Sequence, residues 1–186
     1  IHARAGYLLL GLLLFRWLWG LLGSPHARFA SFLRSPGSMI DYGRRLLGGR
    51  PPAFAGHNPL GGAMVLVMLL SLSFQAVSGL FMTDDIFFKA PLNGWVNGDT
   101  VDILMALHHL NANLLVVLIA GHLLALVVHR FKGERLVGAM ITGRKALERR
   151  PEDEPGAGLE RRTASLWLAL VLVVLCALPV IWLWYA

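Results

Sequence analysis

The chain has 186 residues, of which 56% are hydrophobic and only 15% are charged, against about 45–50% and about 25% in soluble domains. This composition excludes a disordered chain, a collagen-like chain and an ordinary water-soluble enzyme, and the single cysteine excludes a disulfide framework or a four-cysteine zinc site. The formal net charge is +6. Such a surplus indicates nucleic-acid binding only where the basic residues form a patch, so their positions decide its meaning.

Four segments are apolar enough to cross a membrane. A spanning helix needs roughly 20 mostly apolar residues, and residues of about 5–23, 60–82, 101–128 and 165–186 meet that requirement. Arg16 is the one charge well inside an apolar run. The sequence therefore predicts an all-α integral membrane protein, a helical bundle with four transmembrane helices.

The loops between these spans differ in charge. Loop 24–59 holds five arginines and one aspartate, and loop 130–164 holds nine basic and six acidic residues, whereas loop 83–100 holds three aspartates and one lysine. Because positive loops stay inside, we expect loops 24–59 and 130–164 to be cytoplasmic and loop 83–100 to be periplasmic. Topology thus explains the basic charge, and a nucleic-acid partner is not expected.

This orientation makes the first span run inward, and the chain begins at Ile1 rather than at a methionine. We therefore expect an upstream segment, either a cleaved signal peptide or an earlier helix. At the other end, residues 149–164 are charged and rich in Pro and Gly, which predicts a flexible linker. The last span is then free to sit apart from the other three.

Two histidines of the third span share one face. His108 and His122 are 14 residues apart, which on an α-helix is about 40° in azimuth and about 21 Å along the axis. Histidines at membrane depth usually face the bundle interior and carry a function. The structural alternative for each is a hydrogen bond to a neighbouring backbone carbonyl.

His2 and His108 are expected at similar depth on different helices, because each lies near the outer end of its span. Two facing imidazoles suit the iron of a haem, whereas zinc requires three or four converging ligands. His122 has no evident partner in the chain. A histidine near the cytoplasmic end of an upstream helix would match its depth and would place a second haem roughly 20 Å below the first.

Two arginines lie at about the depths of these histidines. Arg16 follows His2 by 14 residues, so it lies on nearly the same face one level further in. Two interpretations stay open: Arg16 extends to the inner headgroups, or it pairs with a propionate of an inner haem, since arginine pairs well with carboxylates. Arg4 is a candidate for the same role at the outer level.

These residues resemble the prokaryotic cytochrome b561 family, which shares its haem-binding bundle with the b-type cytochrome subunits of nickel–iron hydrogenases. The resemblance rests on HARAGYLLLGLLLFRWLWGLLGSPHARFASF from His2, GHNPLGGAM from Gly56, LHHLNANLLVVLIAGHLLALVVH from Leu107 and LVGAMITGRK from Leu136. It implies a four-helix core with two b haems and four histidine ligands. His2 and His108 match the outer pair and His122 matches an inner ligand. The first-helix histidine has no counterpart, so the chain looks like a member without its first helix.

The resemblance also divides the chain and singles out His57. It implies a cytochrome domain over 1–148, a linker over 149–164 and an additional helix over 165–186. In the GHNP stretch, Asn58 and Pro59 are suited to begin a helix. His57 is a further candidate contact of an inner-haem propionate or of a quinone headgroup.

The leading hypothesis is transmembrane electron transfer through b haems in a bacterial inner membrane. The electrons would pass between the quinone pool and a periplasmic cytochrome, or a dehydrogenase- or hydrogenase-type subunit of a larger assembly, without catalytic residues of this chain. The alternative is a haem-free structural or anchor subunit. A channel or transporter is disfavoured, because the spans show no paired broken helices and almost no carboxylates.

Overall fold

The computed structural model describes residues 1–49, 51–84, 86–134, 136–142, 145, 150–153 and 164–185. Arg50, Asp85 and most of the predicted linker 149–164 lie outside this part of the chain. Four long helices dominate what is described, namely α1 (His2–Leu22), α4 (Pro59–Ser78), α5 (Gly98–Phe131) and α7 (Leu166–Tyr185). Each is long and apolar enough to span a membrane. The protein is therefore an all-α membrane protein, as the sequence predicts.

The boundaries of the spans differ slightly from the predicted ones. The first helix begins three residues earlier, at His2, and α4 continues into a 3-10 turn, η2 (Gly79–Phe81). The third helix has 34 residues, which corresponds to about 51 Å and exceeds a hydrocarbon core of about 30 Å. The polar ends of α5 therefore extend beyond the apolar layer.

Local capping explains where two of these helices begin. The Asn58 side-chain oxygen accepts a hydrogen bond from the Gly61 amide at 2.8 Å, and Pro59 occupies the first turn of α4. The predicted helix start at Asn58 and Pro59 is thus confirmed. Asn97 caps α5 in the same way through the Thr100 amide at 2.9 Å. Each cap satisfies an amide that the helix itself leaves without a partner.

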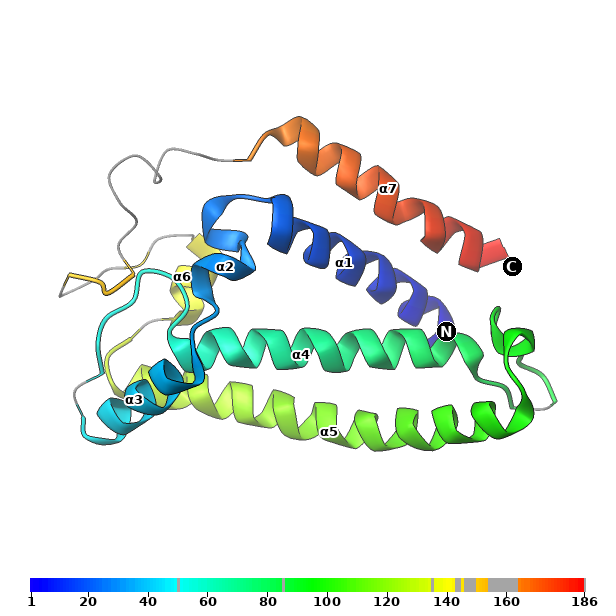
Figure 1. Cartoon of the computed structure of the whole chain (residues 1–186), viewed down its shortest axis with the longest axis horizontal. Helices are drawn as coiled ribbons and strands as arrows, with labels where there is room; N and C mark the ends of the chain where they lie inside the picture. Colours follow the sequence, from blue (N-terminus) through cyan, green and yellow to red (C-terminus); the bar gives the residue numbers. More distant parts are fainter. Residues whose placement is uncertain are drawn as a thin grey trace.

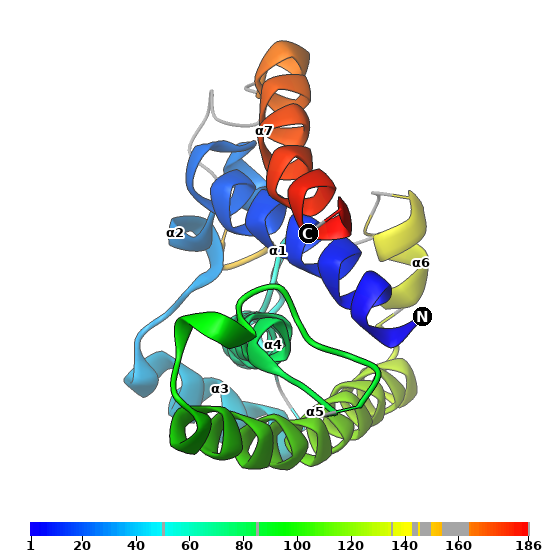
Figure 2. The same cartoon turned by 90° about the vertical axis from the view of Figure 1, so that its right-hand side faces the viewer.

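The helices are stacked in the order α7, α1, α4, α5, with α4 and α5 antiparallel (Figure 1) and α1 between α7 and α4 (Figure 2). Although the predicted linker leaves the last span free to sit apart, α7 packs along α1. Gly11 permits this close approach: a β-carbon there would lie 2.5 Å from the Val180 side chain. The Arg4 guanidinium carbon also lies 5.1 Å from the centre of the Trp184 ring.

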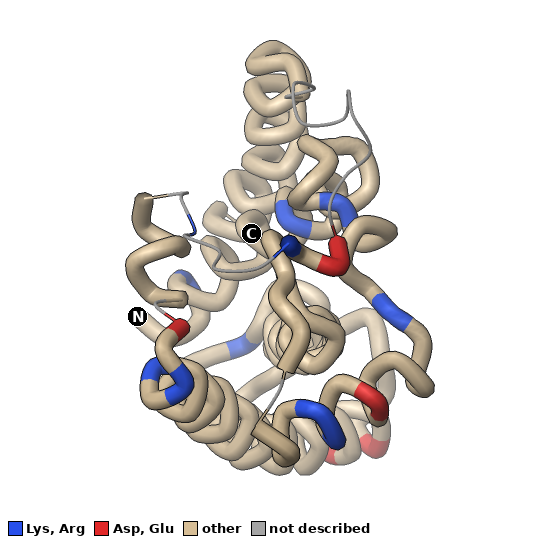
Figure 3. Tube along the Cα trace, turned by 90° about the vertical axis from the view of Figure 1, so that its left-hand side faces the viewer, with Lys and Arg blue, Asp and Glu red and all other residues tan. Residues whose placement is uncertain are grey.

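Short helices close the end of the bundle where α1 finishes. They are η1 (Pro25–Ala27), α2 (Phe29–Phe32), α3 (Pro36–Leu47) and α6 (Leu136–Thr142). Basic residues gather at this end (Figure 3). At the opposite end, the loop before α5 contains η3 (Asn93–Trp95). The packed interior joins Phe29 and Phe32 of α2 to residues of α1 and α4, so α2 covers this end of the bundle. This end is named the inner end below and the opposite end the outer end, after the predicted topology.

Candidate functional site

His2 and His108 meet where α1 begins and α5 has completed its first turns. Their ring centroids are 6.4 Å apart, and the ring planes are inclined by 81°. Imidazole nitrogens bind metals at about 2.0–2.1 Å, so two imidazoles on opposite sides of one metal ion have centroids roughly 6–7 Å apart. The observed separation lies within that range. The structure therefore brings together the two histidines that the sequence places at similar depth.

A glycine leaves space beside this pair. Gly6 follows His2 by four residues, so the two share a face of α1. Apart from the backbone of α1 and the two adjacent residues, no heavy atom lies within 4 Å of the position that a Gly6 β-carbon would occupy. Space of this kind is what a flat group larger than a single ion requires next to its ligands.

Ser78 contacts the other side of the His108 ring. Its hydroxyl oxygen lies 2.9 Å from Nδ1 of His108 and 3.2 Å from the carbonyl oxygen of Gln75. The Ser78 residue is only 2% exposed. Sequence reasoning missed it, and its one signal is a polar residue close to the outer end of an apolar span. The contact fixes which nitrogen of His108 remains available for a metal.

His122 lies in different surroundings. It is half-buried on α5, and its 14-residue separation from His108 corresponds to about 21 Å along the helix. Among the described residues, no side chain forms a hydrogen bond, an ion pair or a ring contact with it. His109, the neighbour of His108, is exposed. Within the described part of the chain, His108 therefore contacts a histidine of another helix, whereas His122 contacts none.

The two arginines occupy separate environments. Arg16 donates from Nη1 to the carbonyl of Ala27 at 3.2 Å, and its guanidinium carbon lies 5.0 Å from the ring centre of Phe29. Arg16 thus joins α1 to the cap of short helices at the inner end. Arg4 is exposed near the outer end, where it covers the Trp184 ring of α7.

An open groove of about 700 Å³ lies beside His57 at the inner end. It is lined by the end of α1, by η1 and α2, by the turn before α4 and by the start of α7. The His57 ring packs on Phe32, with centroids 4.9 Å apart. The carboxylate of Asp153 accepts hydrogen bonds from the amides of Ala55 (2.5 Å) and Gly56 (2.7 Å), which anchors the turn that carries His57.

The electrostatics of the groove keep His57 neutral. Desolvation, followed by the positive charge of Arg16, lowers the pKa of His57, and the carboxylate of Asp153 opposes this effect. Although part of the residue is exposed in the groove, the surrounding atoms still desolvate the ring. A neutral imidazole can accept a proton, so His57 is suited to bind a hydroxyl group.

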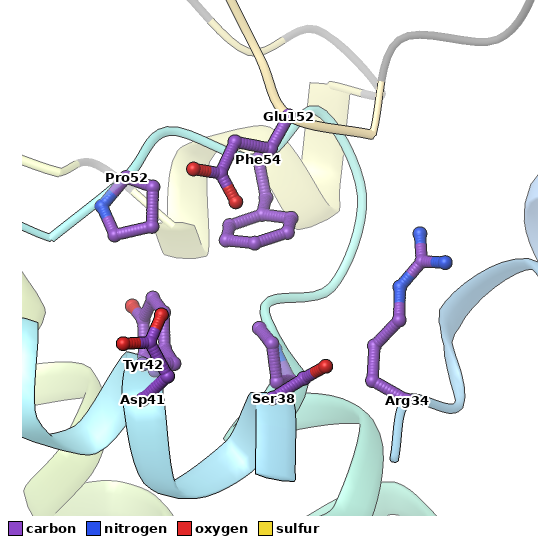
Figure 4. A pocket seen from close by; sticks show the side chains of 8 residues that line it. Arg34, Ser38, Asp41, Tyr42, Pro52, Phe54 and Glu152 are labelled. Carbon is purple, nitrogen blue, oxygen red and sulfur yellow. The ribbon is translucent and has the colours of Figure 1, made fainter.

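A second cavity, of about 220 Å³, lies between α3 and the loop before α4 (Figure 4). Its carboxylates, Asp41 and Glu152, both face Arg45, at 2.8 and 3.6 Å. Burial, together with the charge of Glu134, raises the pKa of Tyr42 to about 12, so this phenol is neutral. Both carboxylates of the lining thus pair with Arg45, and these ion pairs connect α3 to Glu152.

A family model described as prokaryotic cytochrome b561 matches residues 1–143. The chain belongs to the prokaryotic cytochrome b561 family. Membership implies b-type haem binding and electron transfer across a membrane. Neither the curated proteins nor the solved structures contain a match to this chain. The matched region of the cytochrome includes α1, α4, α5 and α6, whereas α7 lies beyond it.

The residues of this cytochrome fit a haem at its outer end. The imidazoles of His2 and His108 come from different helices, the separation of their centroids suits one metal ion, and the β-carbon position of nearby Gly6 is open. Among the described residues, no cluster of three or more His, Cys, Asp or Glu side chains forms an alternative metal site. At the other level, His122 has no ring contact with a second histidine among the described residues.

Proposed function

We infer that this cytochrome carries single electrons across a bacterial inner membrane, between the quinone pool and a periplasmic redox partner. The observation that carries the proposal is the facing pair His2 and His108, one imidazole from each of two helices. When bound, a b haem supplies reversible one-electron chemistry of its iron. The protein supplies ligands, position and an apolar environment, so no catalytic acid or base at this pair is required.

His2 and His108 hold the outer haem in this proposal, and His122 holds an inner one. The second ligand at the inner level comes from outside the described residues. Arg16 uses one of its five donors on the Ala27 carbonyl, so other donors are available for an inner-haem propionate. Arg4, whose guanidinium carbon lies over the Trp184 ring, is proposed for an outer propionate through its N–H donors.

The groove at His57 is the place where we propose that a quinol binds. Its volume of about 700 Å³ lies within the usual range for small-molecule sites, about 300–1,000 Å³. A quinol that becomes a quinone releases two electrons and two protons. Neutral His57 accepts one proton from a quinol hydroxyl, the second proton passes to water at the open side of the groove, and the two electrons leave singly through the cytochrome. The lowered pKa of His57 supports this role because it keeps the acceptor form present at neutral pH.

The test replaces each histidine of the outer pair and compares the reduced-minus-oxidised spectra of purified protein. His108→Ala and His2→Ala should each remove the same b-type absorption, because a haem bound by two histidines needs both. The matched control is His109→Ala, which removes an exposed neighbouring imidazole and should leave the spectrum unchanged. Unchanged haem content in His108→Ala, combined with failed assembly, would instead support the anchor subunit.

A further inference from the structure

A buried serine determines how His108 is oriented. The hydroxyl oxygen of Ser78 lies 2.9 Å from Nδ1 of His108, and Ser78 is only 2% exposed. Ser78 ends α4, whereas His108 lies on α5. The contact therefore joins the end of α4 directly to one of the two histidines of the pair.

The hydrogen-bond partners of Ser78 determine the direction of this bond. A serine hydroxyl has one proton and two acceptor lone pairs. That proton is donated to the carbonyl oxygen of Gln75, at 3.2 Å, because a carbonyl can only accept. The Ser78 oxygen must then accept from His108, so Nδ1 carries the hydrogen. The remaining nitrogen, Nε2, keeps its lone pair for a metal.

A polar cluster one turn away keeps the two helices in register. Asn111 donates to the side chain of Gln75 at 2.7 Å and to the backbone of Ser71 at 3.0 Å, and it accepts from the Ser71 hydroxyl at 2.7 Å. These bonds connect α5 to α4 within the apolar stretches of both helices. They hold the helices together without contacting His108, which makes Asn111 a suitable control.

We propose that Ser78 is a positioning residue that sets the redox potential of the haem at His108. This inference rests on the proposed role of His108 as an iron ligand. A hydrogen bond donated by the far nitrogen of a ligating imidazole makes the imidazole a stronger electron donor. A stronger donor stabilises ferric iron relative to ferrous iron, so the Ser78 bond lowers the potential. It also fixes the plane of the His108 ring against that of His2.

The first experiment is a redox titration of the full chain carrying Ser78→Ala, purified with its haem. Partners of metal ligands typically change affinity by about 10–100-fold. We expect the ferric-over-ferrous preference to fall about tenfold, which for one electron is a rise in midpoint potential of about 59 mV. Asn111→Ala should weaken the α4–α5 packing but leave this potential in place. An unchanged potential in Ser78→Ala would overturn the proposal.

A second pair of variants separates the hydroxyl from the shape of the side chain. The side chains introduced by Ser78→Thr and Ser78→Val have nearly equal volume, but only threonine retains the hydroxyl group. We expect the threonine variant to keep the parental potential and EPR signal, and the valine variant to change both, because the EPR anisotropy of a low-spin haem depends on the angle between its imidazole planes. Equal changes in the two variants would show that the hydroxyl has no role, and so would loss of haem from both.

Different results would reject the haem-ligand role of His108 and the positioning role of Ser78. If His108→Ala retains the full haem content, the ligand assignment is wrong and so is the role of Ser78. If His108→Ala loses the haem while Ser78→Val behaves like Ser78→Thr, the electron-transfer function stands and only the positioning role is rejected.

Discussion

The outer and inner ends of the bundle surround their histidines differently. At the outer end His108 has an imidazole partner from α1 and a serine partner from α4. At the inner end His122, on the same face of the same helix, has neither among the described residues. The inner end instead has a cap of short helices and a groove. The helical repeat alone thus places His108 and His122 on one face of α5 at two depths. The side chains around each histidine then determine what can bind there.

The largest expected effect tests whether the two levels hold separate haems. His122→Ala should remove one haem per protein and leave the haem of His2 and His108 in place, because the two histidines are about 21 Å apart along α5. Haem content by pyridine haemochrome and the potentials that remain provide the measurement. If His122→Ala keeps all its haem, no haem is bound at His122, and the claim that the two levels hold separate haems is rejected.

A smaller effect is expected from filling the space beside His2. Gly6→Val places a branched side chain where nothing lies within 4 Å, and it should hinder the haem of the outer pair. Overpacking costs about 1–3 kcal/mol, or roughly 5–150-fold in affinity, as measured by haem titration. Leu8→Phe enlarges an exposed position on another face of α1 and serves as the control. Equal loss in both variants would argue against a haem beside Gly6.

The smallest effect concerns pH at the inner end. The pKa of His57 lies below its ordinary value of 6.5, so the unfolded chain binds a proton more readily than the folded one. The free energy of unfolding should therefore fall as pH drops below about 6.5, and it should stop falling below the folded pKa. Denaturant unfolding at several pH values would show a shallower dependence for His57→Gln. The exposed groove residue His26 provides a control in His26→Gln, and identical slopes in both variants would refute the assignment.

Much of this molecule follows from local pattern. The four spans need only long apolar runs, and the start of α4 needs only Asn58 and Pro59. The common face of His108 and His122 needs only the helical repeat. The packing of α7 could not be predicted, because Gly11 and Val180 are far apart in sequence and neither signals the other. Ser78 was missed for a similar reason: a lone serine in an apolar helix has no meaning until its neighbour is known.

The sequence by itself determined the membrane class, the uneven distribution of charge over the loops and the family, because these depend on composition and on short motifs. Only the tertiary structure decided that His2 faces His108, that Ser78 orients the latter, and that His57 borders a groove. Such contacts depend on how the helices cross and on how far each is shifted along its neighbour. Side-chain packing over the whole bundle determines both quantities, and apolar runs of similar composition leave them open.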